Sequence, residues 1–346
     1  MTRCALGFGI AAAGLLVLGC AAPPRPDGGV SRWEQARADA ALAIADEQIA
    51  AGHLDQARQS LAVLKHSPDP RCQLRLARLE LEHGEYEAAL RRLDQLAERA
   101  LPTSEAHRLR AVALEGAGRR ADAAQAYAAA YDLAPSVELL IAQVETLAAD
   151  EQVAPARDLL DGERGRFPGH VALQVLAARL ALRATDPQAA VTDLRTAALA
   201  EPTSPEIRRL LAESLMAAGR SSESVELWRE LATGSASAEE RRAYQGRLAA
   251  ALAASGQAQP AHELYQALLA AEANNLKLRL EMAAAALAAG RPAEALAAAQ
   301  LVLSQRDDPE ALLVAAISYK RLGRGDLAAA QLARIRADGP AGPLAP

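Results

Sequence analysis

The fold is decided by residues 104–135, which read SEAHRLRAVALEGAGRRADAAQAYAAAYDLAP. Gly118 can adopt the left-handed backbone conformation that ends a helix, and Pro135 cannot continue the helix that precedes it. Ala111 stands seven residues before this glycine and Ala123 five residues after it. Small side chains at these places let two helix backbones approach closely. The stretch therefore predicts two short helices folded against each other at Gly118, which need neighbours to bury their remaining apolar faces.

The same spacing recurs along the chain. Aligned on the turn, successive copies lie 32 to 37 residues apart, with the turn residues Gly52, Gly84, Gly118, Glu151, Thr185, Gly219, Gly256, Gly290 and Gly323. Alanine stands seven residues before the turn in eight of the nine copies, and five residues after it in eight of the nine. Because alanine makes up a quarter of the chain, chance would place it about twice in each column. An unspecialised helical bundle would not repeat the same spacing about every 34 residues.

Nine copies in register resemble the tetratricopeptide repeat, over roughly residues 38–340. The resemblance implies an all-α fold, a right-handed superhelix (α-solenoid) of about nine helix-turn-helix repeats. In such a solenoid each repeat touches only its neighbours. We place the solenoid at residues 31–338. Residues 339–346, which contain three prolines, are predicted to form a disordered tail.

Residues 1–19 have the organisation of a signal peptide. Arg3 precedes an uncharged run that is short for a membrane span. The run ends in Val17-Leu18-Gly19-Cys20, which resembles a bacterial lipobox. This resemblance implies cleavage after Gly19 and lipidation of Cys20, by palmitate among other acyl chains, with residues 20–30 as a flexible tether rich in proline and glycine. An ordinary secretory signal with an incidental cysteine is the alternative.

The residue after Cys20 bears on location. By resemblance to bacterial lipoproteins, Ala21 in place of an aspartate favours the outer membrane over the inner one, with the protein facing the periplasm. Removal of the signal peptide would leave Cys72 as the sole cysteine besides Cys20. One thiol cannot form an internal disulfide, so we expect a small buried side chain rather than a redox centre.

The sequence proposes no reaction. It contains no His-Glu-x-x-His, Cys-x-x-Cys or Gly-x-Ser-x-Gly motif. Residues 116–121 and 323–328 fit a loose dinucleotide fingerprint, but each follows a predicted helix and not the strand that the fingerprint needs. We interpret both as repeat turns. The net charge of −5 gives no reason to expect nucleic acid. We therefore expect no enzyme, no cofactor and no metal.

The remaining candidate site is a surface. By resemblance to the family, the first helix of each repeat lines a concave face through its second, fifth, ninth and twelfth residues. The candidate partner groove consists of Arg71, Arg78, Arg108, Glu145, Arg179, Arg209, Leu280, Leu287, Leu313 and Ile317. A charged face is often only solvated, and this alternative stays open for each single residue. The hypothesis is that the groove as a whole binds a polypeptide.

Two places depart from the regular pattern. In the fourth repeat, Gly162 and Gly165 interrupt the second helix, which indicates either a bend or a degenerate copy without a function. At the C-terminal end no polar capping helix follows the last repeat, so Leu327, Leu332 and Ile335 are predicted to be partly bare. Exposed apolar surface at a solenoid end favours docking or self-association.

Together these patterns predict a non-catalytic scaffold, anchored by lipid to the outer membrane and facing the periplasm, that binds proteins in its groove. By resemblance, lipoproteins of this family serve pilus biogenesis, exopolysaccharide export and outer-membrane protein assembly, and we expect one of the first two. A periplasmic chaperone or regulatory adaptor that engages its clients transiently is the alternative. An accessory of enzymes that remodel the cell wall is a third.

Overall fold

The computed structural model describes residues 32–65, 69–98 and 103–338, and within them the chain is helical without strands. The helices are α1 (Arg32–Ala50), α2 (Leu54–Ala62), α3 (Pro70–Glu82), α4 (Tyr86–Ala97), α5 (Ser104–Gly116), α6 (Arg120–Leu133), α7 (Val137–Ala149), α8 (Val153–Glu163), η1 (Arg164–Arg166), α9 (Val171–Arg183), α10 (Pro187–Ala200), α11 (Pro205–Ala217), α12 (Ser221–Gly234), α13 (Ala238–Ala254), α14 (Ala258–Ala271), α15 (Leu276–Ala288), α16 (Pro292–Leu303), α17 (Pro309–Arg321) and α18 (Gly325–Asp338). The predicted all-α class is confirmed. The signal peptide, tether and tail predicted for residues 1–19, 20–30 and 339–346 lie outside the described residues.

The chain divides after His83 into two compact units, with α1–α3 in unit 1 and α4–α18 in unit 2. In unit 1, α1, α2 and α3 pack around a core that includes Ala45, Ala57 and Leu61. Cys72 is buried in this core, as the sequence predicted. Ion pairs between α3 and α1 border it, such as the one from Arg75 to the carboxylate of Asp46 at 2.7 Å.

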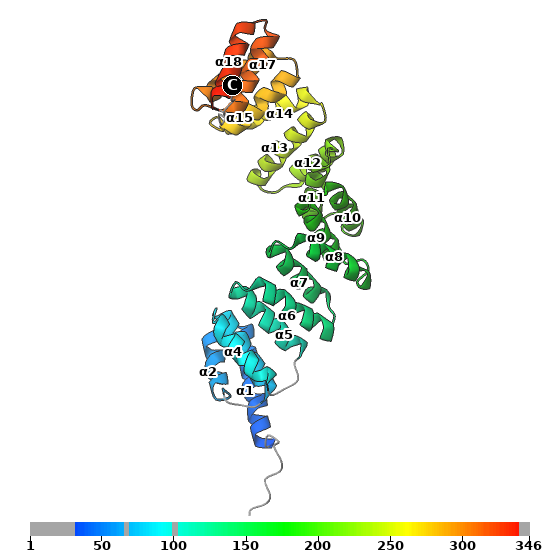
Figure 1. Ribbon diagram of the computed structural model, residues 1–346, viewed down its shortest axis with the longest axis vertical. Coiled ribbons are helices and arrows are strands. Elements are labelled where there is room, and N and C mark those ends of the chain that lie inside the picture. Colours follow the sequence, from blue (N-terminus) through cyan, green and yellow to red (C-terminus); the bar gives the residue numbers. More distant parts are fainter. Residues whose placement is uncertain (1–31, 66–68, 99–102, 339–346) are drawn as a thin grey trace, which may run out of the picture. The chain divides into compact units, whose positions relative to one another are not determined.

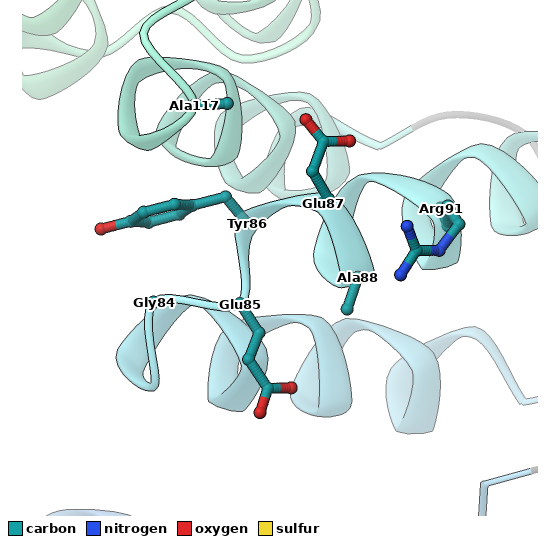
Figure 2. Close-up of a pocket in the computed structure, with 7 residues that line it drawn as sticks. All are labelled: Gly84, Glu85, Tyr86, Glu87, Ala88, Arg91 and Ala117. Atoms are coloured by element: carbon teal, nitrogen blue, oxygen red, sulfur yellow. The ribbon is translucent and has the colours of Figure 1, made fainter.

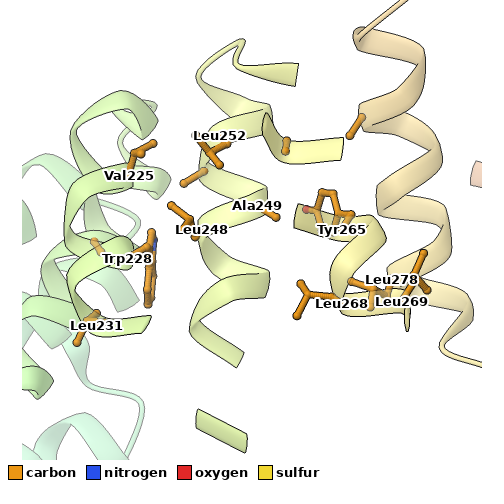
Figure 3. Close-up of a cluster of buried hydrophobic side chains, with 14 residues drawn as sticks. Val225, Trp228, Leu231, Leu248, Ala249, Leu252, Tyr265, Leu268, Leu269 and Leu278 are labelled. Atoms are coloured by element: carbon orange, nitrogen blue, oxygen red, sulfur yellow. The ribbon is translucent and has the colours of Figure 1, made fainter. Parts of the chain in front are cut away.

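In unit 2 each helix packs mainly against the helices before and after it in the chain (Figure 1). Because the contacts are local, the core is a series of small clusters rather than one centre. Figure 3 shows one of them, in which the Trp228 ring lies between α12 and α13. The Trp228 ring centroid is 6.0 Å from that of Tyr244, and its indole N–H donates to the sulfur of Met216 at 3.3 Å.

The turns confirm the predicted register. All nine residues aligned as turn positions have a positive φ, including seven glycines such as Gly118 at 77°. Glu151 and Thr185 adopt the same conformation without being glycines, with φ of 61° and 57°. The small residues seven positions before and five positions after each turn are buried, and Ala111 and Ala123 are both fully inaccessible. The close approach of paired helices therefore imposes the turn even where the residue is unfavourable for it.

The fourth repeat is irregular where the sequence predicted an interruption. Its second helix, α8, ends at Glu163 and is followed by the single 3-10 turn η1. Contacts to α6 hold this ending in place. The Tyr131 hydroxyl donates to the Glu163 carboxylate at 2.7 Å, and the Arg166 guanidinium donates to the same carboxylate at 2.9 Å while lying over the Tyr131 ring. The first of these two hydrogen bonds is the larger cause that lowers the pKa of Glu163.

The turn at Thr185 yields a stability prediction. A β-branched residue with positive φ is strained, by about 1–2 kcal/mol for L-residues in the left-handed region. Thr185→Gly should remove this strain and, after the loss of glycine entropy, stabilise the chain by about 0.5–1 kcal/mol in thermal or denaturant unfolding. The matched control is Ala184→Gly, because Ala184 has φ of −81° and should lose stability. A Thr185→Gly variant as unstable as this control would contradict the strain argument.

Candidate partner-binding surface on the first helices

Side chains on the first helices of successive repeats link directly in unit 2. Arg179 on α9 pairs with Glu206 on α11 at 2.6 Å, and the Thr146 hydroxyl on α7 donates to the Glu115 carboxylate on α5 at 2.5 Å. Arg179 and Glu206 are both exposed, so their ion pair lies on the surface, whereas Thr146 is buried where α5 and α7 meet. The first helices of unit 2 therefore share a face that carries the Arg179–Glu206 pair, and its role as a partner groove stays a prediction.

The charged candidates on this face fall into two classes. Arg179 is engaged by Glu206, and Arg209 forms an i, i+4 pair with Glu213 at 3.0 Å. Exposed pairs of this kind contribute little to stability, but they hold the side chains in place and neutralise them. Arg108 on α5 and Glu145 on α7 are exposed, and no ion pair joins either to another described residue. These two charges are available to a partner.

Two further candidates, Arg71 and Arg78, lie on α3 in unit 1. Arg71 pairs with Asp39 of α1 at 2.9 Å and with Asp69, its own N-cap residue, at 2.7 Å. The hydrogen bond to Asp69 is the larger cause that raises the pKa of the Arg71 guanidinium. Arg78 is exposed and makes no ion pair with a described residue.

The four apolar candidates separate into two exposed and two buried residues. Leu313 and Ile317 on α17 are 47% and 38% exposed. Leu280 and Leu287 on α15 are buried in a core cluster that also contains Val314 of α17. Leu280 and Leu313 occupy the same place in successive repeats, and Leu280 shares its core cluster with Val314 on the next first helix, α17. Leu280 and Leu287 are therefore core residues and do not belong to the accessible surface.

A hydrogen-bonded group on this face was not anticipated from the sequence. The Glu115 carboxylate accepts from the Tyr127 hydroxyl at 2.9 Å and from the Thr146 hydroxyl at 2.5 Å, which ties the third repeat to the fourth. Burial is the main cause that raises the pKa of Tyr127, and the neighbouring Glu115 carboxylate raises it further. Glu115 stands at the twelfth position of its helix, so the register could have indicated it. Thr146 stands at a packing position, and nothing in its spacing pointed to this role.

A surface pocket of about 460 Å³ lies where α4 meets the end of α5 (Figure 2). The Tyr86 ring projects from the start of α4 beneath the α5 end, and it fits there because Gly116 lacks a side chain. A Cβ on Gly116 would lie 2.2 Å from that ring. Glu85 and Glu87 point to opposite sides of the chain, so their carboxylates do not converge on the pocket. The arrangement is that of a packing joint between two repeats.

A second pocket, of about 270 Å³, lies between α8 and α10. Its charges satisfy one another: Arg157 pairs with Asp186 at 3.1 Å, and Arg164 pairs with Asp161 at 3.2 Å and with Asp193 at 2.9 Å. These pairs connect the fourth repeat to the fifth. They leave no charged group of the lining directed at a ligand.

The two glycine-containing segments are repeat turns, as predicted. Residues 116–121 join α5 to α6, and residues 323–328 join α17 to α18, so a helix precedes each of them. Among the described residues, no group of three or more His, Cys, Asp or Glu side chains could hold a metal ion. None of the helices in residues 32–65, 69–98 and 103–338 has the length and apolarity needed to cross a bilayer.

The C-terminal end differs from every earlier repeat at one packing position. Leu332 on α18 is 43% exposed, whereas the residues at this position in the eight preceding repeats are at most 4% exposed. Leu327 is equally exposed, and Ile335 is half-buried. The predicted partial exposure is confirmed for all three residues, least strongly for Ile335.

Comparisons with known proteins agree with this geometry. A tetratricopeptide repeat-like domain model matches residues 34–149, and a tetratricopeptide repeat model matches residues 175–239. The two matches together span more than half of the chain. The chain belongs to the tetratricopeptide repeat family. Domains of this family generally bind protein partners and are generally non-catalytic scaffolds.

Solved structures of tetratricopeptide repeat proteins resemble the chain in fold. The C-terminal part of one from Cytophaga hutchinsonii shares 12% identity over 76% of this chain and 94% of that chain, with a TM-score of 0.51. One from Parabacteroides merdae shares 12% identity over 68% and 93%, with a TM-score of 0.50. PilW, a type IV pilus biogenesis factor, shares 17% identity over 59% of this chain and 94% of that chain, with a TM-score of 0.48. No curated protein sequence matches the chain. At these identities the structural likeness shows the fold alone.

Proposed function

We propose that this tetratricopeptide repeat protein is a non-catalytic scaffold, anchored by lipid to the periplasmic face of the outer membrane, that holds partner polypeptides on the first-helix face of unit 2. The observation that carries the binding role is the shared face itself, along which the Arg179–Glu206 pair joins successive repeats. We place the scaffold in an envelope machine, for pilus biogenesis or exopolysaccharide export, on the resemblance of the sequence to lipoproteins of this family.

The rigidity of the face supports a binding role. Charges that are already paired across repeats keep their geometry when a partner arrives, which lowers the ordering cost of association. Arg108 and Glu145 stand among them without ion-pair partners in the described chain, on neighbouring first helices. Charges at such places set specificity and association rate more than affinity. A partner segment with complementary charges at that spacing fits the face.

A chaperone or regulatory adaptor with transient clients would use the same face. The two roles differ in stoichiometry. A scaffold co-purifies steadily with one envelope complex, whereas a chaperone brings down many clients, each in substoichiometric amount.

The role of the face is tested by exchanging its two available charges. Arg108→Glu combined with Glu145→Arg keeps the net charge and breaks no ion pair of the described chain, so the fold should be unchanged. The yield of the partner complex in affinity purification from membranes should fall by about 10-fold or more, which corresponds to roughly 1.4 kcal/mol of binding energy.

The matched control exchanges two charges on a second helix. Arg120 and Asp132, at opposite ends of α6, are exposed and make no ion pair with described residues. Arg120→Glu with Asp132→Arg should leave the partner yield unchanged, and it places each charge favourably for the helix dipole. Equal yields from both double variants would rule out the first-helix face as the binding surface.

The anchor is tested separately at Cys20, which lies outside the described residues. Several acyl chains on one cysteine would hold the protein durably on a bilayer, because one chain alone binds only marginally. Cys20→Ser should therefore move the protein from the membrane fraction to the soluble periplasmic fraction, with its helical circular dichroism unchanged. Retention of Cys20→Ser in the outer-membrane fraction would contradict lipid anchoring at this residue.

We also propose that the exposed end of α18 is a self-association surface, because Leu332 is exposed among the described residues whereas its counterparts in the other repeats are buried. Light scattering at increasing concentration should show a mass above that of the monomer, and Leu332→Gln should restore the monomer. Leu199→Gln is the control, since Leu199 on α10 is 85% exposed but stands far from this end in the sequence. A monomeric native chain at every concentration would refute self-association.

A further inference from the structure

Helix α1 begins earlier in its repeat than the first helix that follows it. Aligned on Ala45 and Ala77, the equivalent packing alanines of α1 and α3, α1 begins six residues before the start of α3. Six helical residues add about 9 Å to the helix. The first buried side chain among those described in α1 is Ala38. The first turn and a half of α1 is therefore an extension in which Trp33, Gln35, Ala36 and Arg37 are all exposed.

This extension starts an exposed apolar stripe. Trp33 is 68% exposed, and Ala40 and Ile44 follow it at helical spacings of seven and eleven residues, with Ile44 50% exposed. The stripe lies opposite Leu42, which is buried. At the places of Ala40 and Ile44, α3 carries buried residues because α2 packs against it. Among the described residues of unit 1, nothing covers this side of α1.

The exposed indole has a cationic neighbour on the same helix. The Arg37 guanidinium lies 5.6 Å from the centre of the Trp33 ring, within the range of a cation–π contact. Tryptophan combines a large apolar ring with a polar N–H, and it is enriched at the boundary between lipid headgroups and acyl chains. An arginine one turn away can keep its charge in the headgroup layer while its methylene stem covers apolar surface.

We propose that the N-terminal turns of α1 rest on the bilayer surface, with Trp33 inserted at the headgroup boundary. This inference relies on the proposed anchor at Cys20. Twelve residues separate Cys20 from Trp33. A connection of that length spans at most about 45 Å when extended and about 20 Å as a random coil. The anchor would therefore keep Trp33 beside the bilayer at an effective concentration in the millimolar range.

Charge differs between the two ends of α1: residues 32–37 contain two arginines and one glutamate, whereas residues 38–50 contain three carboxylates and no lysine or arginine. Asp46 and Glu47 lie near the end of the helix and are both exposed. Carboxylates are unfavourable close to anionic headgroups, so this end of α1 stands away from the surface. Contact at Trp33 and Arg37 alone would tilt α1 and thereby fix the orientation of unit 1 on the membrane. The anchor would then hold the protein at the membrane, and the Trp33 contact would decide which side of unit 1 faces away from the lipid.

The two tryptophans of the chain make this contact measurable. Trp228 is fully buried, so Trp228→Phe leaves Trp33 as the sole indole reporter. The lipidated full chain carrying Trp228→Phe is purified from membranes and reconstituted in phosphatidylethanolamine–phosphatidylglycerol vesicles, with and without brominated acyl chains. Flotation of the vesicles reports the anchor. We expect Trp33 emission to shift to shorter wavelength relative to the Cys20→Ser chain in buffer, and to be quenched by the brominated lipid.

Each other outcome decides against the contact. Protein that floats with the vesicles while Trp33 emission is neither shifted nor quenched overturns the membrane contact and leaves the anchor standing. Protein that does not float contradicts the anchor and the contact together. A shift that appears without vesicles and grows with protein concentration assigns the stripe to a second copy instead. If Trp228→Phe does not fold, the native chain is compared with Trp33→Phe, and equal quenching of the two overturns the proposal.

Discussion

The structure depends on the close approach of two helix backbones in each repeat. They meet at the small residues that stand seven positions before and five positions after each turn. Ala111 and Ala123 are fully buried where the two helices of one repeat meet, and their counterparts are buried in the other repeats. A larger side chain at such a place would force the helices apart, because protein interiors are packed too densely to absorb it. The same approach dictates the turn geometry so strongly that Glu151 and Thr185 adopt it at a steric cost.

This local packing explains why the candidate sites are surfaces and not cavities. Each helix is covered mainly by its neighbours in the chain, so the first helices keep one side for solvent and for partners. It also explains the ends of the described chain. Leu332 on α18 is exposed where its counterparts are buried, and Ile44 on α1 is exposed where the residue at its place in α3, Leu76, is buried. The interior repeats thus show which of these side chains a neighbouring helix would cover.

The sequence predicted what depends on spacing. The nine turns and the exposure of Leu332 all follow from a phase of about 34 residues. It did not predict what depends on the following repeat: Leu280 occupies the groove position that Leu313 occupies, but α17 buries it. Nor did it predict the Thr146–Glu115 hydrogen bond, because a contact between two repeats depends on side-chain geometry that one repeat's spacing does not contain. The Trp33 stripe was likewise visible only once the opposite face of α1 was known to be buried.

In unit 2, a change in one repeat should alter the stability of the adjacent repeats and of no others. The most direct test is hydrogen exchange, followed by mass spectrometry, on Ala123→Leu, which overpacks the third repeat at an expected cost of about 1–3 kcal/mol. Exchange should accelerate in α5, α6 and α7 and stay at its native rate in α15, α16 and α17. Uniform acceleration across unit 2 would show a single global core and would contradict the account.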